Sequence, residues 1–124
     1  MTSVTPSTPF QIKRGDTFPA LAATLSNSAG VINLTGATVE LILTPLSGAI
    51  NPVTGLPATK VQGACTIISA TLGQVQYNWG ATDTSIAGNY YAEFQITYLG
   101  GGIQTVPTVG YIPVQVIANL TGTG

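Results

Sequence analysis

The strongest constraint on the fold of this chain is the regular alternation of apolar and polar residues between Asn89 and Tyr98. Every second residue of this run is apolar, from Tyr90 through Phe94 to Tyr98, and the residues between them are mostly polar. Because side chains of an extended strand point to opposite faces in turn, this pattern predicts a β-strand with one buried face. The chain also holds 19 Thr, 11 Ile and 10 Val residues, whose branched side chains favour pleated sheets over helices.

Similar runs of alternating or β-branched residues predict that strands fill most of the chain. Turn-forming Gly, Pro, Asn and Ser residues separate these runs, as they do in antiparallel sheets. Seven or eight short strands at this spacing predict an all-β fold, an antiparallel β-sandwich. Besides residues 89–98, the predicted strands are Phe10–Lys13, Thr17–Leu25, Ala37–Thr44, Gln62–Ser69, Gln74–Trp79 and Tyr111–Ile117.

Proline and glycine add local detail to this prediction. Pro113 has no N–H to donate to a ladder, so the strand that holds it is expected at a sheet edge. The triplet Gly100-Gly101-Gly102 predicts a hairpin tip. Arg14-Gly15-Asp16 is formally a cell-adhesion tripeptide, but Gly between two charged residues after a short strand predicts an ordinary β-turn.

The composition divides the chain into one domain and two tails. Residues 1–9 are rich in Ser, Thr and Pro and predict an extended N-terminal arm. Residues 10–120 hold all the predicted strands and form the sandwich domain, which at this length is a single unit. Residues 121–124 contain only Thr and Gly and are expected to be a C-terminal tail.

The scarcity of ionisable side chains excludes several functions. Only 3 residues are Lys or Arg and 4 are Asp or Glu, so 6% of the 124 residues are charged, against about 25% in ordinary domains. The chain has no basic patch that could neutralise backbone phosphates, so we do not expect it to bind nucleic acid. With no His and one Cys, the chain has no His-based triad, no Cys/His zinc site and no internal disulfide. The chain has no run of about 20 apolar residues, so the sequence predicts no membrane-spanning helix.

The four carboxylates do not predict a catalytic or metal site. Asp16 and Asp83 fall in predicted turns, and Glu40 and Glu93 fall on the outward faces of predicted strands. A glycosidase needs two carboxyl groups facing each other across a cleft, and calcium needs several oxygens in one loop. Asp83 is instead expected to cap its turn. We therefore expect a non-enzymatic protein without cofactor or metal.

The low charge itself is the basis of a functional hypothesis. A nearly uncharged surface is poorly protected against association with other proteins. Such a surface suits a subunit that neighbouring subunits normally cover.

The segment from Asp83 to Tyr90 resembles the tyrosine corner of immunoglobulin-like (Ig-like) domains, which implies that the predicted fold is an Ig-like antiparallel β-sandwich of about seven or eight strands. There, a Tyr near the start of a strand bonds through its hydroxyl to backbone a few residues upstream. The order of motifs along the chain resembles the N-terminal domain of the baseplate upper protein (BppU) family of tailed phages. The matching segments are Phe10–Pro19, Leu34–Val39, Gly73–Trp79 with Asp83-Thr84, Gly88–Phe94 and Gly110–Ile112.

This resemblance implies a structural component of a tailed-phage virion, made in the bacterial cytoplasm, with an Ig-like sandwich that binds other virion proteins. It implies no catalysis. The alternative is that the chain has the same structural role elsewhere in the particle, as a capsid decoration (cement) protein or as a neck protein. Within the particle, we expect contacts with tail, baseplate, neck or capsid subunits and with further copies of this chain, and none with membrane or nucleic acid.

Contacts with neighbours are expected from the arm, from the irregular segment Pro45–Ala58 and from the hairpin tip, where an extended arm could add a strand to a neighbour's sheet. Alternation places Tyr77, Trp79 and Phe94 in the core, but Tyr91 and Tyr111 on the surface, where Tyr is common at interfaces. A carbohydrate-binding module, which would use an exposed aromatic platform, is the second alternative. The candidate interface residues are Thr5, Pro6, Thr8, Pro9, Leu46, Ile50, Pro52, Leu56, Tyr91, Leu99 and Tyr111.

Overall fold

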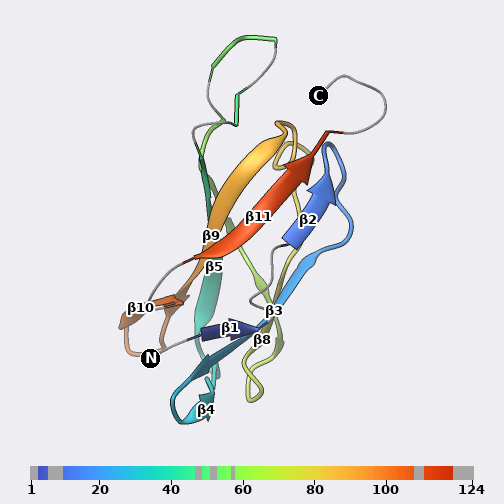
Figure 1. Ribbon diagram of the computed structural model, residues 1–124. Coiled ribbons are helices and arrows are strands. Elements are labelled where there is room, and N and C mark those ends of the chain that lie inside the picture. Colours follow the sequence, from blue (N-terminus) through green and yellow to red (C-terminus); the bar gives the residue numbers. More distant parts are fainter. Residues whose placement is uncertain are drawn as a thin grey trace.

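The computed structural model describes residues 3–5, 10–46, 49–50, 53–56, 58–107 and 111–118, with the backbone alone for 3–5. These residues form two β-sheets and contain no helix, and hence none that could span a membrane. Figure 1 shows the two sheets packed as a sandwich. The strands are β1 (Ser3–Thr5), β2 (Phe10–Lys13), β3 (Leu21–Asn27), β4 (Gly30–Val31), β5 (Thr38–Pro45), β6 (Val61–Ala64), β7 (Thr66–Ser69), β8 (Gln74–Tyr77), β9 (Gly88–Thr97), β10 (Ile103–Val106) and β11 (Ile112–Ile117).

The strand order is that of an Ig-like sandwich. The first sheet has the order β1-β3-β8-β7, with β4 also on β3, and the second has the order β2-β11-β9-β5-β6, with β10 also on β9. All pairs are antiparallel except β2 with β11. In Ig domains, strands A, B, E and D form one sheet and C, F and G the other. Here β1, β3, β8 and β7 occupy the places of the first set, and β5, β9 and β11 those of the second, which confirms the predicted fold class.

The core lies between the inward faces of the two sheets. On β9, the buried and less buried residues alternate as the sequence predicts, with Tyr90, Phe94 and Ile96 inside. Trp79 and Tyr77 are also buried, and their rings meet edge to face with centroids 5.2 Å apart. The predicted core role of these aromatic residues is therefore confirmed.

The predicted tyrosine corner is present at the start of β9. The hydroxyl of Tyr90 donates a 2.6 Å hydrogen bond to the carbonyl of Ile86, four residues upstream. Close packing next to it explains Gly88, because a Cβ added there would lie 2.6 Å from the Cβ of Ala49. This corner fixes how the chain enters β9 and therefore where the outward Tyr91 stands.

Several predicted strand limits are wrong. The run Gln62–Ser69 is two strands, because the chain leaves the second sheet after β6 and joins the first as β7, while Cys65 between them donates its N–H to the carbonyl of Val39 at 2.8 Å. The strand predicted from Thr17 begins only at Leu21. The described strands outnumber the seven or eight expected, because the run Gln62–Ser69 is divided and because the short strands β1, β4 and β10 lie outside the predicted ranges.

The expected edge position of Pro113 is also wrong, since β11 lies between β2 and β9. Pro113 pairs with Tyr91 on β9, whereas the described ladder with β2 begins one residue later, at Val114 opposite Phe10. A residue without an N–H is therefore tolerated at the end of β11 that precedes the parallel ladder.

Candidate interaction surface

The predicted interface residues fall into three groups in the structure. Pro6, Thr8, Pro9 and Pro52 lie outside the described residues. Thr5 belongs to β1, where it is opposite Thr24 of β3 in the same chain. The remaining ones lie on the second sheet or on its connections: Leu46, Ile50, Leu56, Tyr91, Leu99 and Tyr111.

Two of these residues form an exposed aromatic pair. The rings of Tyr91 and Tyr111 stack with centroids 4.9 Å apart and an interplanar angle of 4°. Tyr91 is opposite Pro113 on the outward face of the second sheet, and Tyr111 precedes Pro113 by two residues, so the rings meet diagonally across two strands. The side chains remain 39% and 55% exposed, respectively, which confirms that both lie on the surface.

A shallow groove of about 320 Å³ adjoins this pair. Leu46 reaches it because the N–H of Leu46 donates to the carbonyl of Asn89 at 2.9 Å, just beyond the end of the β5–β9 ladder. Gln115 also lines the groove, and its Oε1 accepts a 2.8 Å hydrogen bond from Nε2 of Gln11. We call the aromatic pair and the groove the docking face: Leu46, Asn89, Tyr90, Tyr91, Tyr111, Pro113, Val114 and Gln115.

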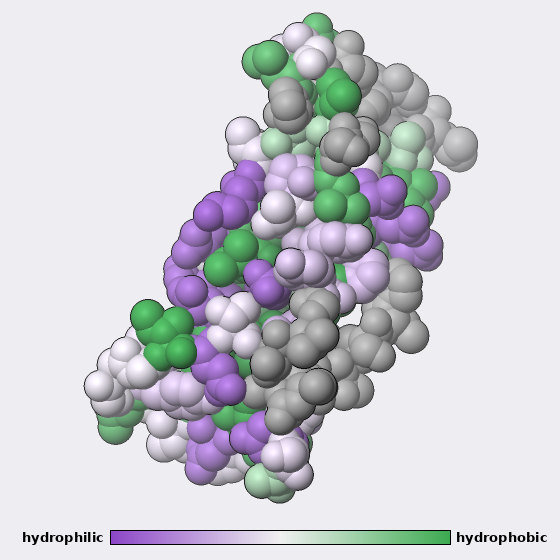
Figure 2. Space-filling model, turned by 60° about the vertical axis from the view of Figure 1, so that its left-hand side comes forward, coloured by the Kyte–Doolittle hydropathy of each residue, from purple (hydrophilic) through white to green (hydrophobic). Residues whose placement is uncertain are grey.

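The structure does not bring the other described candidates to this face. Leu99 lies at the tip of the β9–β10 hairpin, where Tyr98 and Gly102 close the predicted turn with a 2.7 Å backbone bond. Six strand residues, or ~20 Å, separate the position of Tyr91 from the end of β9. Ile50 and Leu56 are exposed in the connection between β5 and β6. In the view of Figure 2, hydrophobic side chains accordingly occur in separate groups and not as one patch.

Two of the four carboxylates, those of Asp83 and Glu40, form hydrogen bonds within the fold. Oδ2 of Asp83 accepts hydrogen bonds from the hydroxyl of Tyr77 at 2.5 Å and from the N–H of Gly80 at 2.7 Å. Oε1 of Glu40 accepts from Nε2 of Gln62 at 3.3 Å. In the described part of the chain, no three His, Cys, Asp or Glu side chains come together as a metal site would require.

The turn Arg14-Gly15-Asp16 is held against the domain by hydrogen bonds to Thr84 and Ser85. Gly15 has a φ of 82°, and its N–H donates to the carbonyl of Thr84 at 3.0 Å. Thr84 is completely buried and donates its hydroxyl to the carbonyl of Asp16 at 2.8 Å. Nη1 of Arg14 donates to the carbonyl of Ser85 at 3.1 Å, so this guanidinium serves the fold. The predicted β-turn is confirmed, but sequence reasoning missed Thr84 because nothing marks a buried threonine among 19.

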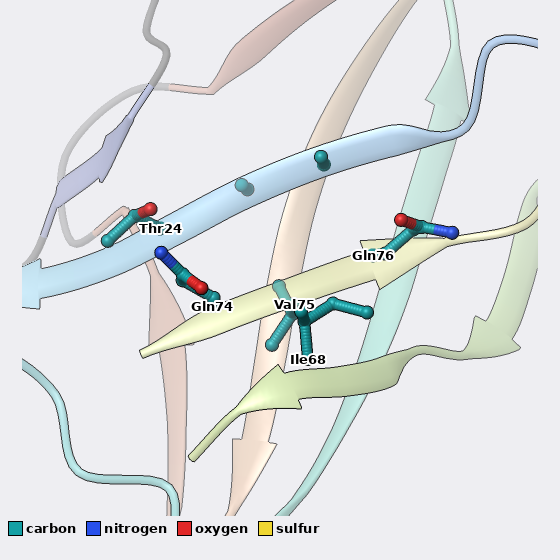
Figure 3. A pocket seen from close by; sticks show the side chains of 7 residues that line it. Thr24, Ile68, Gln74, Val75 and Gln76 are labelled. Carbon is teal, nitrogen blue, oxygen red and sulfur yellow. The ribbon is translucent and has the colours of Figure 1, made fainter. Parts of the chain in front are cut away.

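A second groove, of about 370 Å³, lies on the first sheet and was not predicted. Figure 3 shows Thr24 of β3 beside Gln74 of β8, in agreement with their register, and Ile68 of β7 near Val75. Ala22 and Thr24 of β3 are smaller than Gln76 and Gln74, which lie opposite them on β8, and this difference leaves the hollow. The strands of this sheet contain no charged residue, whereas β2, β5 and β9 of the second sheet carry Lys13, Glu40 and Glu93.

No family model matches the sequence, and no curated protein matches it. A similar arrangement of strands occurs in the crystal structure of CopC from Methylosinus trichosporium OB3b, with 13% sequence identity and a TM-score of 0.46. That match covers 94% of this chain and 91% of the other.

Proposed function

We propose that this chain is a non-enzymatic structural protein of a tailed-phage virion, which binds a neighbouring virion subunit through its docking face. The observation that carries the proposal is the exposed, stacked pair Tyr91 and Tyr111 beside a groove on the second sheet. The resemblance of the motif order to the BppU family supplies the phage setting.

The docking face has the composition of a protein interface. Tyrosine is enriched in such interfaces because it offers a large flat surface and a polar hydroxyl. The two rings already hold each other in place, so binding a partner costs less side-chain entropy than it would for two separate side chains. The groove between Leu46 and Pro113 can receive an apolar side chain of the partner, and the amides of Asn89 and Gln115 can donate or accept at its edge.

The experiment uses particles of the phage that encodes the chain, dissociated into capsid, neck, tail and baseplate fractions. We expect the purified chain to bind the tail or baseplate fraction and Tyr91→Ala to weaken this binding at least about ten-fold. Leu72→Ala is the matched control, because Leu72 is 52% exposed but lies in the turn between β7 and β8 of the other sheet. Binding to the capsid or neck fraction would support the alternative location. Binding to no fraction would contradict the proposal.

A second candidate, a carbohydrate-binding module, is favoured by the same aromatic pair. Sugar rings stack on exposed aromatic faces, and the amides of Asn89 and Gln115 could bond to hydroxyl groups. The stacking of Tyr91 on Tyr111, however, occupies one face of each ring. Binding of host cell-wall polysaccharide that Tyr91→Ala abolishes, without binding to any virion fraction, would favour this candidate.

A further inference from the structure

The N-terminal strand β1 is a short element at the edge of the first sheet. It pairs antiparallel with β3, with Ser3 opposite Ser26, Val4 opposite Leu25 and Thr5 opposite Thr24. Among the described strands, β3 is its one partner, and Figure 1 shows the two side by side. Three residue pairs therefore make up the described ladder between β1 and β3.

Four residues connect β1 to β2, which belongs to the other sheet. Their sequence is Pro6-Ser7-Thr8-Pro9. Proline restricts its own φ and disfavours helical backbone in the residue before it, so such a sequence prefers extended conformations. A short connection with this preference favours exchange of the element it joins between copies of a protein.

We propose that β1 exchanges between two copies of this chain, so that Ser3–Thr5 of each copy pairs with β3 of the other. The occupant of this edge follows from the structure, because β3 already binds this segment in a defined register. Exchange replaces the β1–β3 pairing within one chain by the same pairing between two chains, so it needs no contact that the sequence does not already make. Reciprocal exchange closes the assembly as a two-fold dimer.

The charge distribution permits two copies to approach along this edge. The strands of the first sheet (β1, β3, β4, β7 and β8) contain no Lys, Arg, Asp or Glu. Sheet edges that must stay unpaired are commonly protected by charged side chains, which repel a second edge. This edge lacks such protection on the strands that form it.

This inference concerns a different surface from the docking face and a different partner, a second copy. It relies on the proposed function only for the setting in which many copies assemble. Loss of exchange leaves the Tyr91 and Tyr111 pair intact, and loss of docking leaves the β1–β3 register intact. The two proposals therefore fail independently.

Disulfide trapping tests the exchange directly. One chain carries Ser3→Cys and an isotope-labelled second chain carries Ser26→Cys, both with Cys65→Ala to remove the natural thiol. The two chains are unfolded together, refolded at high concentration in a glutathione redox buffer and separated without reductant. Ser3 and Ser26 are direct partners, so their Cα atoms are within disulfide range only when β1 of one chain lies on β3 of the other.

The matched control pairs Ser3→Cys with Thr24→Cys. Thr24 lies on the same strand but is opposite Thr5, two residues out of register. We expect the mixed covalent dimer to form at least ten-fold more from the matched pair than from this control. Equal yields, or no mixed dimer after joint refolding, would overturn the proposal.

The unaltered chain gives a second, independent measurement. Sedimentation equilibrium up to millimolar concentration should show a monomer–dimer equilibrium that deletion of residues 2–5 abolishes and Tyr91→Ala leaves unchanged. A chain that stays monomeric throughout, or a dimer that survives the deletion, would contradict strand exchange.

Discussion

The hydroxyl of Tyr77, at the end of β8, donates a 2.5 Å hydrogen bond to Oδ2 of Asp83 in the loop that leads to β9. The same oxygen accepts the N–H of Gly80 at 2.7 Å. One carboxylate therefore ties a core side chain to the loop that crosses between the sheets. This loop also supports the tyrosine corner through Ile86 and the turn at Gly15 through Thr84.

Tyr77→Phe should lower the free energy of unfolding by about 1–2 kcal/mol, because a hydrogen bond to a charged acceptor is lost while the ring stays in the core. Urea denaturation followed by tryptophan fluorescence measures this change, since Trp79 contacts the Tyr77 ring. Tyr111→Phe is the control, because Tyr111 is exposed on the docking face, and should change the free energy by less than about 0.5 kcal/mol. Equal effects of the two substitutions would show that the Asp83 bond contributes nothing.

Gly63→Ala should destabilise the domain by about 1–3 kcal/mol, the usual cost of forcing atoms into a packed core. A Cβ at Gly63 would lie 2.8 Å from Cε1 and 2.9 Å from the hydroxyl oxygen of Tyr77, so the ring and its bond to Asp83 must shift. The double variant Gly63→Ala with Tyr77→Phe should therefore lose less stability than the sum of the two single variants. Strict additivity would contradict this coupling.

Stability should fall in alkaline solution through Cys65. Burial and the nearby Glu40 carboxylate raise the pKa of the Cys65 thiol from 9.0 to about 12. A raised folded-state pKa means that the unfolded chain loses its proton first, so stability is complete below pH 9 and declines between about pH 9 and 12. The decline should not exceed about 1.4 kcal/mol per pH unit for this group.

Cys65→Ala separates this contribution from that of tyrosine. Burial and the Asp83 hydrogen bond also raise the pKa of Tyr77, which adds a loss of stability only above its ordinary value of 10.0. Denaturation at pH 9 to 10 should therefore show a decline in the unaltered chain that is absent in Cys65→Ala. A decline of the same size in both would assign the effect to another group.

The alternation along the chain predicts the fold well wherever a strand is long and has one buried face. On β9, Tyr90, Phe94 and Ile96 are buried and Tyr91 is exposed, because a period of two has only one register that places apolar residues inside. The same argument failed at Cys65, where the apolar pattern continues although the chain changes sheets. Sequence spacing contains no information about which sheet a strand joins.

The candidate surface was predictable only in part. Alternation places Tyr91 on the surface, but its contact with Tyr111 depends on the pairing of β9 with β11, which periodicity does not specify. The groove at Leu46 depends in the same way on the continuation of the β5–β9 ladder. The pairing of β1 with its own β3 was likewise not predicted, since three residues of Ser, Val and Thr carry no register signal.

Tyr90→Phe should lower the free energy of unfolding by about 1 kcal/mol or more, because the carbonyl of Ile86 then loses a 2.6 Å hydrogen bond in a partly buried place. The loss should come from this hydrogen bond, since the ring keeps its place in the core. A variant that unfolds at the same urea concentration as the unaltered chain would show that the corner is not a stabilising element.

Binding through the docking face should depend little on salt. The groove is lined by neutral side chains, Leu46, Asn89, Pro113 and Gln115 among them, so burial of apolar surface and neutral hydrogen bonds must supply the affinity. Affinity for the virion fraction, measured by surface plasmon resonance at low and high sodium chloride, should change by less than about two-fold. Tyr91→Ala should weaken binding equally at both salt concentrations. A steep fall of affinity with salt would mean that the few charged residues, and not the aromatic pair, hold the partner.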